Sequence, residues 1–241
     1  MKESMTKLLL VCLVATIAIL ATGISATAAI KWDWEYNQSD WIKKLYDDPL
    51  TANGICYALS YNWVKRGLKE EETNAKTYKK TKVFVPIARI YKQYHATYLL
   101  EKGKDGAHKF FKKMGMKKDG LKVTVAYGDS AWVFFKKDQY DKAAGMVAQL
   151  PDDFYMFGFR GPDQASHMCA LQIKGKQIIF FDPNYGQFTA SRKKFKKWLG
   201  ALLSDEYGSW LGGAGDVKAA WQIVRVEIDD EKKFEKAPLT P

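Results

Sequence analysis

The hydrophobic pattern of this chain changes its period near residue 150, and this change constrains the fold more than any other feature. Before that point apolar residues recur at helical spacing, as in Ile55, Leu59 and Trp63. After it, segments rich in aromatic and branched residues predict strands at 154–159, 168–173, 177–181 and 221–228. Helices followed by a mostly antiparallel sheet indicate an α+β fold.

The same patterns place the remaining elements. Helices are expected at 39–46, 56–67, 86–101, 105–116, 139–150 and 191–203, and one earlier strand at 121–127. Gly67 is interpreted as a helix stop. Residues 68–82 are highly charged, so we expect a surface excursion there. No repeat or low-complexity linker divides the chain, which predicts one domain over residues 29–241.

The first 28 residues have the layout of a secretory signal peptide. Lys2 and Lys7 precede an apolar run over 8–21, and Ala26-Thr27-Ala28 offers a small-residue cleavage site. The rival interpretation is an uncleaved anchor, but the strongly apolar part is short of the about 20 residues that span a bilayer. We therefore expect cleavage near Ala28 and export, to the periplasm, the outside or a host cell.

The chain is basic, with a formal net charge of +11. Loss of residues 1–28 would lower this charge to +10, since it removes two lysines and one glutamate. Such a charge favours anionic partners. No nucleic-acid-binding motif accompanies it, so we expect an acidic or membrane-attached protein, or an anionic membrane surface, rather than nucleic acid. The mature protein is expected to be a monomer.

Cys56 stands at the start of the predicted helix at 56–67, after Gly54-Ile55. A thiol attacks as thiolate, and the positive end of a helix dipole favours that anion. Two alternatives remain open for Cys56. It can be a buried structural cysteine, or it can form a disulfide with Cys169, the only other cysteine after residue 28.

His167 and Asp182 lie on the two strands that Lys174-Gly175-Lys176 joins as a hairpin. With the turn near Gly175, the two residues lie roughly opposite each other, so the carboxylate can orient the imidazole. The alternative for Asp182 is a simple turn residue, because Asp-Pro and Asn-Tyr-Gly are turn signals.

The sequence predicts no cofactor and no metal. Cys56, His167 and Cys169 lack the paired spacing of a zinc site. The glycine-rich segment 212–215 has no clear strand before it, and Asp216 stands where a phosphate-binding loop would carry lysine.

Three segments resemble the YopT/AvrPphB-type cysteine peptidases, a family of bacterial effectors with a papain-like fold. They are Gly54-x-Cys56-x-x-Leu59-Ser60 with Trp63, His167-x-x-Ala170, and Phe180-Phe181-Asp182-Pro183-Asn184-x-Gly186. The resemblance implies a Cys56–His167–Asp182 triad and limited cleavage of a host protein, without fixing which protein.

The chain departs from papain relatives before the cysteine. Thr51 and Leu50 stand where those enzymes often carry an oxyanion-binding glutamine, so Asn53 is the candidate donor, together with the Cys56 backbone N–H. Cys169 shares a strand face with His167. A bridge from it to Cys56 would act as a redox latch, but a packing role is expected.

These observations predict a secreted cysteine endopeptidase that works through an acyl-enzyme. The same triad also suits transglutaminase-like acyl transfer or glutamine deamidation, which differ only in the acceptor. A non-catalytic basic surface-binding protein with a Cys56–Cys169 bridge is the alternative from another class.

Overall fold

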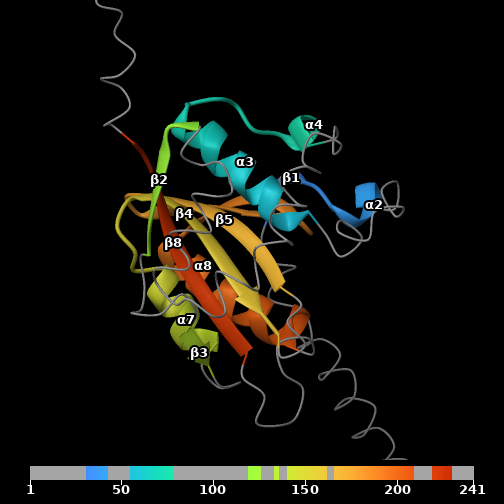
Figure 1. The fold of residues 1–241 in the computed structure, drawn as a ribbon. Coiled ribbons are helices and arrows are strands. Elements are labelled where there is room, and N and C mark those ends of the chain that lie inside the picture. Colours follow the sequence, from blue (N-terminus) through green and yellow to red (C-terminus); the bar gives the residue numbers. More distant parts are fainter. Residues whose placement is uncertain are drawn as a thin grey trace, which may run out of the picture.

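The computed structural model describes residues 31–42, 55–78, 119–125, 133–135, 140–161, 166–208 and 219–229. They form one sheet with helices on both faces (Figure 1). The predicted signal peptide, the predicted helices at 86–101 and 105–116, and Asn53 lie outside these residues. Within them, no helix combines the length and the apolar character needed to cross a membrane.

The sheet has eight strands in the order β1-β7-β6-β5-β4-β8-β2, with β3 also paired to β8. Every pairing is antiparallel. The strands are β1 (Trp32–Glu35), β2 (Leu121–Val125), β3 (Val133–Phe135), β4 (Asp153–Arg160), β5 (Ser166–Lys174), β6 (Gln177–Asp182), β7 (Gly186–Ser191) and β8 (Ala219–Ile228).

The helices agree with the sequence pattern where they are long. They are α2 (Ser39–Ile42), α3 (Cys56–Leu68), α4 (Ala75–Tyr78), α7 (Tyr140–Val147) and α8 (Arg192–Ala201), which continues as the π-helix η6 (Leu202–Glu206). The predicted α+β class is thereby confirmed. Three strands, β1, β3 and β7, were not expected from the sequence.

Two hydrophobic cores lie on opposite faces of the sheet because side chains alternate along each strand. Met156, Met168 and Phe181 pack against α3 in one core. Their chain neighbours Phe157 and Phe180 belong to the other core, which α7 and α8 cover. Burial of each such side chain stabilises the fold by roughly 1.5–3 kcal/mol.

Helix α3 runs along the sheet in the same direction as β5. Near its start the Ser60 hydroxyl donates to the Met168 carbonyl over 2.8 Å. Near its end, a Cβ at Gly67 would overlap the ring of Phe154. Gly67 is therefore needed for close packing, and its interpretation as the helix stop is wrong by one residue, since α3 continues to Leu68. Cys56 is thus placed at the end of the sheet where β5 begins.

The charged segment after α3 does not stay on the surface. Residues 69–72 are exposed, but Tyr78 at the end of α4 is fully buried. Its ring stacks on Phe181 and Trp34, and its carbonyl accepts a hydrogen bond from the Tyr36 hydroxyl. The high charge of the segment predicted an exposed surface excursion, and this prediction is wrong at Tyr78, which packs in the core.

Candidate active site

The β5–β6 hairpin brings His167 and Asp182 into direct contact. The turn is Gly175-Lys176, and the ladder pairs Ala170 with Phe181. One step further along this ladder, Cys169 rather than His167 lies opposite Asp182. The predicted register is therefore wrong by two residues. His167 is instead a diagonal neighbour on the same face, and its Nε2 lies 2.8 Å from Asp182 Oδ1.

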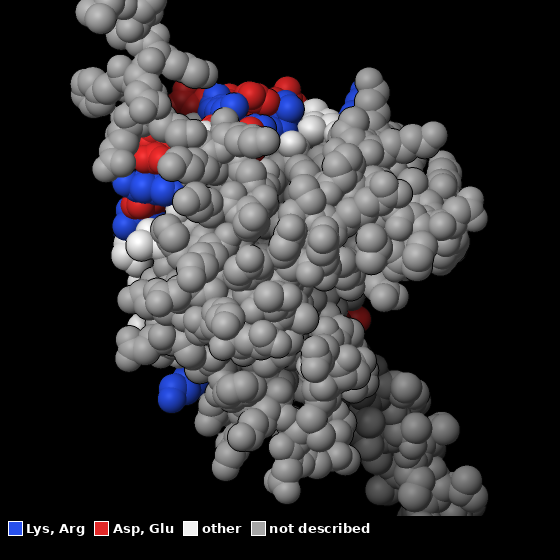
Figure 2. Space-filling view, viewed as in Figure 1, with Lys and Arg blue, Asp and Glu red and all other residues white. Residues whose placement is uncertain are grey.

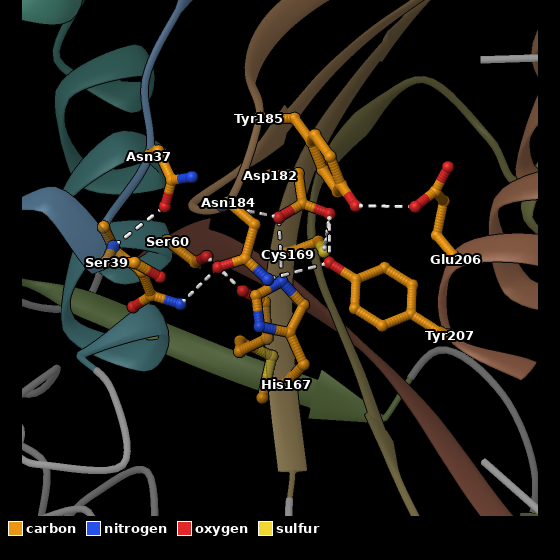
Figure 3. Close-up of polar contacts among 12 residues, drawn as sticks. Asn37, Ser39, Ser60, His167, Cys169, Asp182, Asn184, Tyr185, Glu206 and Tyr207 are labelled. Carbon is orange, nitrogen blue, oxygen red and sulfur yellow. Dashed lines mark hydrogen bonds and ion pairs between the residues drawn. The ribbon is translucent and has the colours of Figure 1, made fainter. Parts of the chain in front are cut away.

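Asp182 is fully buried and accepts four hydrogen bonds (Figure 3). Oδ1 accepts from His167 Nε2 and from the backbone N–H of Asn184, also at 2.8 Å. Oδ2 accepts from the Tyr207 hydroxyl at 3.1 Å and from Cys169 Sγ at 3.5 Å. Because all four partners donate, the carboxylate acts purely as an acceptor. This arrangement puts the proton of His167 on Nε2 and leaves Nδ1 for another group.

The turn that follows Asp182 has three residues and closes at Gly186. The Tyr185 N–H donates to the Asp182 carbonyl, and Asp182 pairs with Gly186 across the turn. Gly186 has φ +114°, and a Cβ there would overlap the Trp34 carbonyl of β1. Asp182 is therefore a turn residue whose carboxylate also contacts His167.

The pKa of His167 is set by two opposed effects. Burial is the largest single effect and lowers it, but the charge of Asp182, the neighbouring Cys169 and the hydrogen bonds to both together raise this pKa well above its ordinary value. The imidazole also packs against two rings that contact each other, stacked on Tyr207 at 5.4 Å and edge-on to Phe159 at 5.3 Å. A positioned imidazolium is the group that stabilises a neighbouring thiolate.

Cys56 is the first residue of α3. It is 8% exposed, whereas Cys169 has no exposed surface, and neither cysteine is in a disulfide. The backbone N–H of Ile55, the residue before Cys56, donates to Gln38 Oε1 over 3.1 Å. Gln38 Nε2 in turn donates to Asn184 Oδ1 over 2.7 Å. The start of α3 is therefore tied to the residue two positions after Asp182.

Comparison with known proteins identifies the class of this site. The family model described as Yersinia/Haemophilus virulence surface antigen, Peptidase_C58, matches residues 29–214. The chain belongs to this family. It is a cysteine peptidase of the YopT/AvrPphB type, a family associated with virulence, and this membership decides against the non-catalytic alternative.

Solved structures similar to this peptidase include that of an avirulence protein. The crystal structure of the Pseudomonas avirulence protein AvrPphB is 18% identical, with a TM-score of 0.49, and the match covers 75% of this chain and 95% of that chain. A search of the curated proteins found no significant match.

Cys169 of this peptidase does more than fill space. Burial raises the pKa of its thiol, and the charge of Asp182 raises it further. The group therefore stays protonated and donates to Asp182. The sequence predicted only packing for Cys169, and it gave no role to Gln38 or Tyr207. Only Asn184 had a signal, as part of the Phe-Phe-Asp-Pro-Asn segment.

His167, Cys169 and Asp182 are also the one group of potential metal ligands among the residues described, with donor atoms within 4.8 Å of one another. Zinc bound by a histidine nitrogen and a carboxylate oxygen would hold those atoms about 3.3 Å apart, given bonds of about 2.0–2.1 Å in tetrahedral geometry. The observed 2.8 Å is a hydrogen-bond distance. The geometry favours a hydrogen-bonded pair over a metal site.

Proposed function

We propose that this peptidase cleaves a host or other target protein through Cys56, His167 and Asp182. The observation that carries the proposal is the buried His167–Asp182 pair, which lies at the end of the sheet where α3 begins. Ser60, one helical turn after Cys56, contacts the residue next to His167. This contact supports the proposal that Cys56 acts together with the pair.

Each residue has a defined role in the proposed reaction. The Cys56 thiolate attacks a peptide carbonyl carbon, and His167 Nδ1 gives a proton to the leaving amine as the C–N bond breaks. The resulting thioester is attacked by water, whose proton His167 accepts, and Cys56 is released as thiolate. Asp182 holds the ring and stabilises its charged form. The Cys56 N–H and Asn53 are the proposed oxyanion donors.

The test uses an epoxide inhibitor of papain-like enzymes, followed by peptide mapping of the reduced protein. Label is expected on Cys56 and not on Cys169, and the label should be lost in His167→Ala. Cys56→Ala should keep the fold, as judged by circular dichroism, and lose all turnover. Retained turnover in Cys56→Ala, or equal labelling of both thiols, would contradict the proposed triad.

Transglutaminase-like transfer and deamidation share the acyl-enzyme and are separated by the product. Mass spectrometry of a protein mixture treated with the wild-type enzyme is expected to show backbone cuts. Amine adducts on glutamine, or a gain of one dalton per glutamine, would identify the other acceptors instead.

We also propose that residues 1–28 direct export and are removed near Ala28. The bacterium that makes the protein should release a form that begins close to Ala29. N-terminal sequencing of the exported protein checks this, and an intact N-terminus would show that the segment is not a cleaved leader.

The proposed partner is an acidic or membrane-attached protein, or an anionic membrane surface. Support comes from α8, whose Lys193, Lys194, Lys196 and Lys197 are all exposed. None of them forms an ion pair with another described residue. By contrast, basic and acidic side chains lie side by side over α3 and β2 (Figure 2), where Lys65 pairs with Asp119.

Binding to vesicles of phosphatidylcholine with phosphatidylserine tests the membrane form of this partner. Changing Lys193, Lys194 and Lys197 to glutamine should weaken binding, and salt should weaken it further. The control variant changes Lys69, Lys76 and Lys122, which removes the same charge from exposed positions after α3, on α4 and on β2. Equal loss in both variants would mean that net charge alone acts, and no binding by the wild type would leave an acidic protein as the partner.

A further inference from the structure

A continuous chain of hydrogen bonds joins the start of α3 to the Asp182 carboxylate. Its first two bonds run from the Ile55 N–H to Gln38 Oε1 and from Gln38 Nε2 to Asn184 Oδ1. Asn184 Nδ2 then donates to the Tyr207 hydroxyl oxygen over 3.0 Å, and that hydroxyl donates to Asp182 Oδ2 over 3.1 Å. Four bonds therefore connect the residue before Cys56 with the partner of His167.

The donor and acceptor roles along this hydrogen-bond chain are fixed by the groups at its two ends. A backbone N–H only donates, so the Gln38 atom that faces Ile55 must be the carbonyl oxygen. The amide nitrogen of Gln38 then faces Asn184, whose oxygen must accept and whose nitrogen must donate to Tyr207. The Tyr207 hydroxyl is left to donate to the carboxylate, which only accepts. No amide flip satisfies all four bonds, so the chain has one polarity.

The hydrogen-bond chain is buried at Gln38 and Tyr207, half-buried at Asn184, and anchored at both ends. Gln38 is 6% exposed and Tyr207 is 8% exposed. The Gln38 N–H donates to the Pro183 carbonyl over 2.8 Å, which fixes its backbone against the turn after Asp182. The Tyr207 ring stacks on His167. A buried polar chain with every member bonded holds its parts in a single arrangement.

We propose that Gln38, Asn184 and Tyr207 are positioning residues that act as one unit, setting the start of α3 against the His167–Asp182 pair. This inference rests on the proposed triad. The three side chains act on the chemistry through Asp182, through the ring of His167 and through the backbone before Cys56. Loss of any link lets α3 and the pair move relative to each other, and a small misplacement is enough to slow the reaction.

The experiment measures alkylation of Cys56 by iodoacetamide as a function of pH, with peptide mapping to separate Cys56 from Cys169. Tyr207→Phe keeps the ring on His167 and removes only the hydroxyl. Gln38→Met keeps the length of the side chain and removes both amide bonds. Each variant breaks the hydrogen-bond chain at one residue and should react about tenfold more slowly at acidic pH, within the range expected for the loss of buried hydrogen bonds. The apparent pKa of the Cys56 thiol should rise toward the about 8.5 of a free cysteine.

The double variant, Gln38→Met with Tyr207→Phe, tests whether the residues act as one unit or as independent contacts. Two independent tenfold effects multiply to about one hundredfold, whereas two cuts in one chain give little more than either alone. Tyr185→Phe is the control, because its hydroxyl also bonds a carboxylate, Glu206, but at the exposed surface. It should leave the rate and the pH profile unchanged, and thermal unfolding checks that all variants fold.

The outcomes distinguish this inference from the proposed triad. If the two rate losses multiply in the double variant, or if Tyr207→Phe leaves the pH profile unchanged, the three residues do not act as one unit. The proposed triad would stand in either case. If wild-type Cys56 reacts no faster than a free thiol at acidic pH, or if Cys56→Ala keeps turnover, the triad itself fails. If Gln38→Met does not fold, Tyr207→Phe and Asn184→Ala form the pair for the double variant.

Discussion

The β5–β6–β7 meander has two ends, and each is organised around one charged side chain. At one end the fully buried Asp182 accepts hydrogen bonds from four donors. At the other end the partly exposed Arg192 donates to the carbonyls of Gly175, Ala148 and Leu150 and to the carboxylate of Asp152. One centre is an anion surrounded by donors, and the other is a cation surrounded by acceptors.

The two centres differ in their exposure to solvent, and this decides how strongly each charge acts on its neighbours. Arg192 joins the hairpin turn, the end of α7 and the start of α8, but water reaches it and its partner Asp152, which is 58% exposed. Charges there interact weakly because they are screened. Around Asp182 the dielectric is low, so its charge acts strongly on His167. The comparison shows that the exposed Arg192 holds neighbouring elements together, while the buried Asp182 helps to raise the pKa of His167.

The largest expected effect follows from removing the buried charge. Asp182→Asn keeps the shape but no longer supports the imidazolium, so the pKa of His167 should fall from its raised value. The rate of epoxide labelling at Cys56 should drop by roughly 10²-fold. Since the imidazolium now loses its proton at lower pH, the alkaline limb of the labelling profile should move to lower pH. An alkaline limb that stays in place would show that Asp182 does not set this pKa.

Arg192→Gln is the matched change at the other end. It removes several donors and should lower the free energy of unfolding by about 1–3 kcal/mol in urea titrations. The labelling rate of the folded protein should stay within about twofold of the wild type. A large loss of labelling in folded Arg192→Gln would mean that the two ends are coupled.

The two hairpin glycines give a second comparison. Gly186→Ala places a Cβ on the Trp34 carbonyl at φ +114°, so it should lower the free energy of unfolding by roughly 3 kcal/mol. Gly175→Ala, at φ +57° with nothing within 4 Å, should cost only about 1 kcal/mol. Chemical denaturation measures both changes, and similar values would mean that contact with β1 contributes little at Gly186.

The smallest effect is expected at Asp152, which accepts from Arg192 and from the Gly175 N–H. Asp152→Asn should lower the free energy of unfolding by less than about 1 kcal/mol, because the pair is exposed. The difference should shrink further in about 1 M salt. A larger, salt-insensitive loss would contradict the view that this end is governed by screening.

The sequence predicted those parts of the fold that local patterns control. The helix from Cys56, the turn at Gly175 and the apolar strands all follow from periodicity or from turn chemistry. β1 and β7 were missed because Trp32–Glu35 and Gly186–Ser191 are short and half polar, and they become strands only by pairing with each other and with β6. Their stability comes from partners distant in sequence, which no local pattern records.

The same limit applies to the site. Cys56, His167 and Asp182 stood in recognisable segments, yet the register of the last two was predicted two residues off. A turn centred on Gly175 would set Asp182 opposite Met168, whereas the observed centre between Gly175 and Lys176 sets it opposite Cys169. Gln38 lies 17 positions before Ile55, and Tyr207 lies 25 after Asp182. Ordinary residues at such distances become parts of a site only when the sheet has formed.

The Gly175-Lys176 turn divides the proposed reactive groups between two halves of the chain. The half before it carries Cys56 and His167, and the half after it carries Asp182 and Tyr207. The turn is exposed and lies at the far end of the sheet from these groups. A protein opened there would give two fragments, each inert alone, whose reassembly restores labelling of Cys56. This peptidase is therefore suited to a split reporter, in which two fused partners bring the halves together.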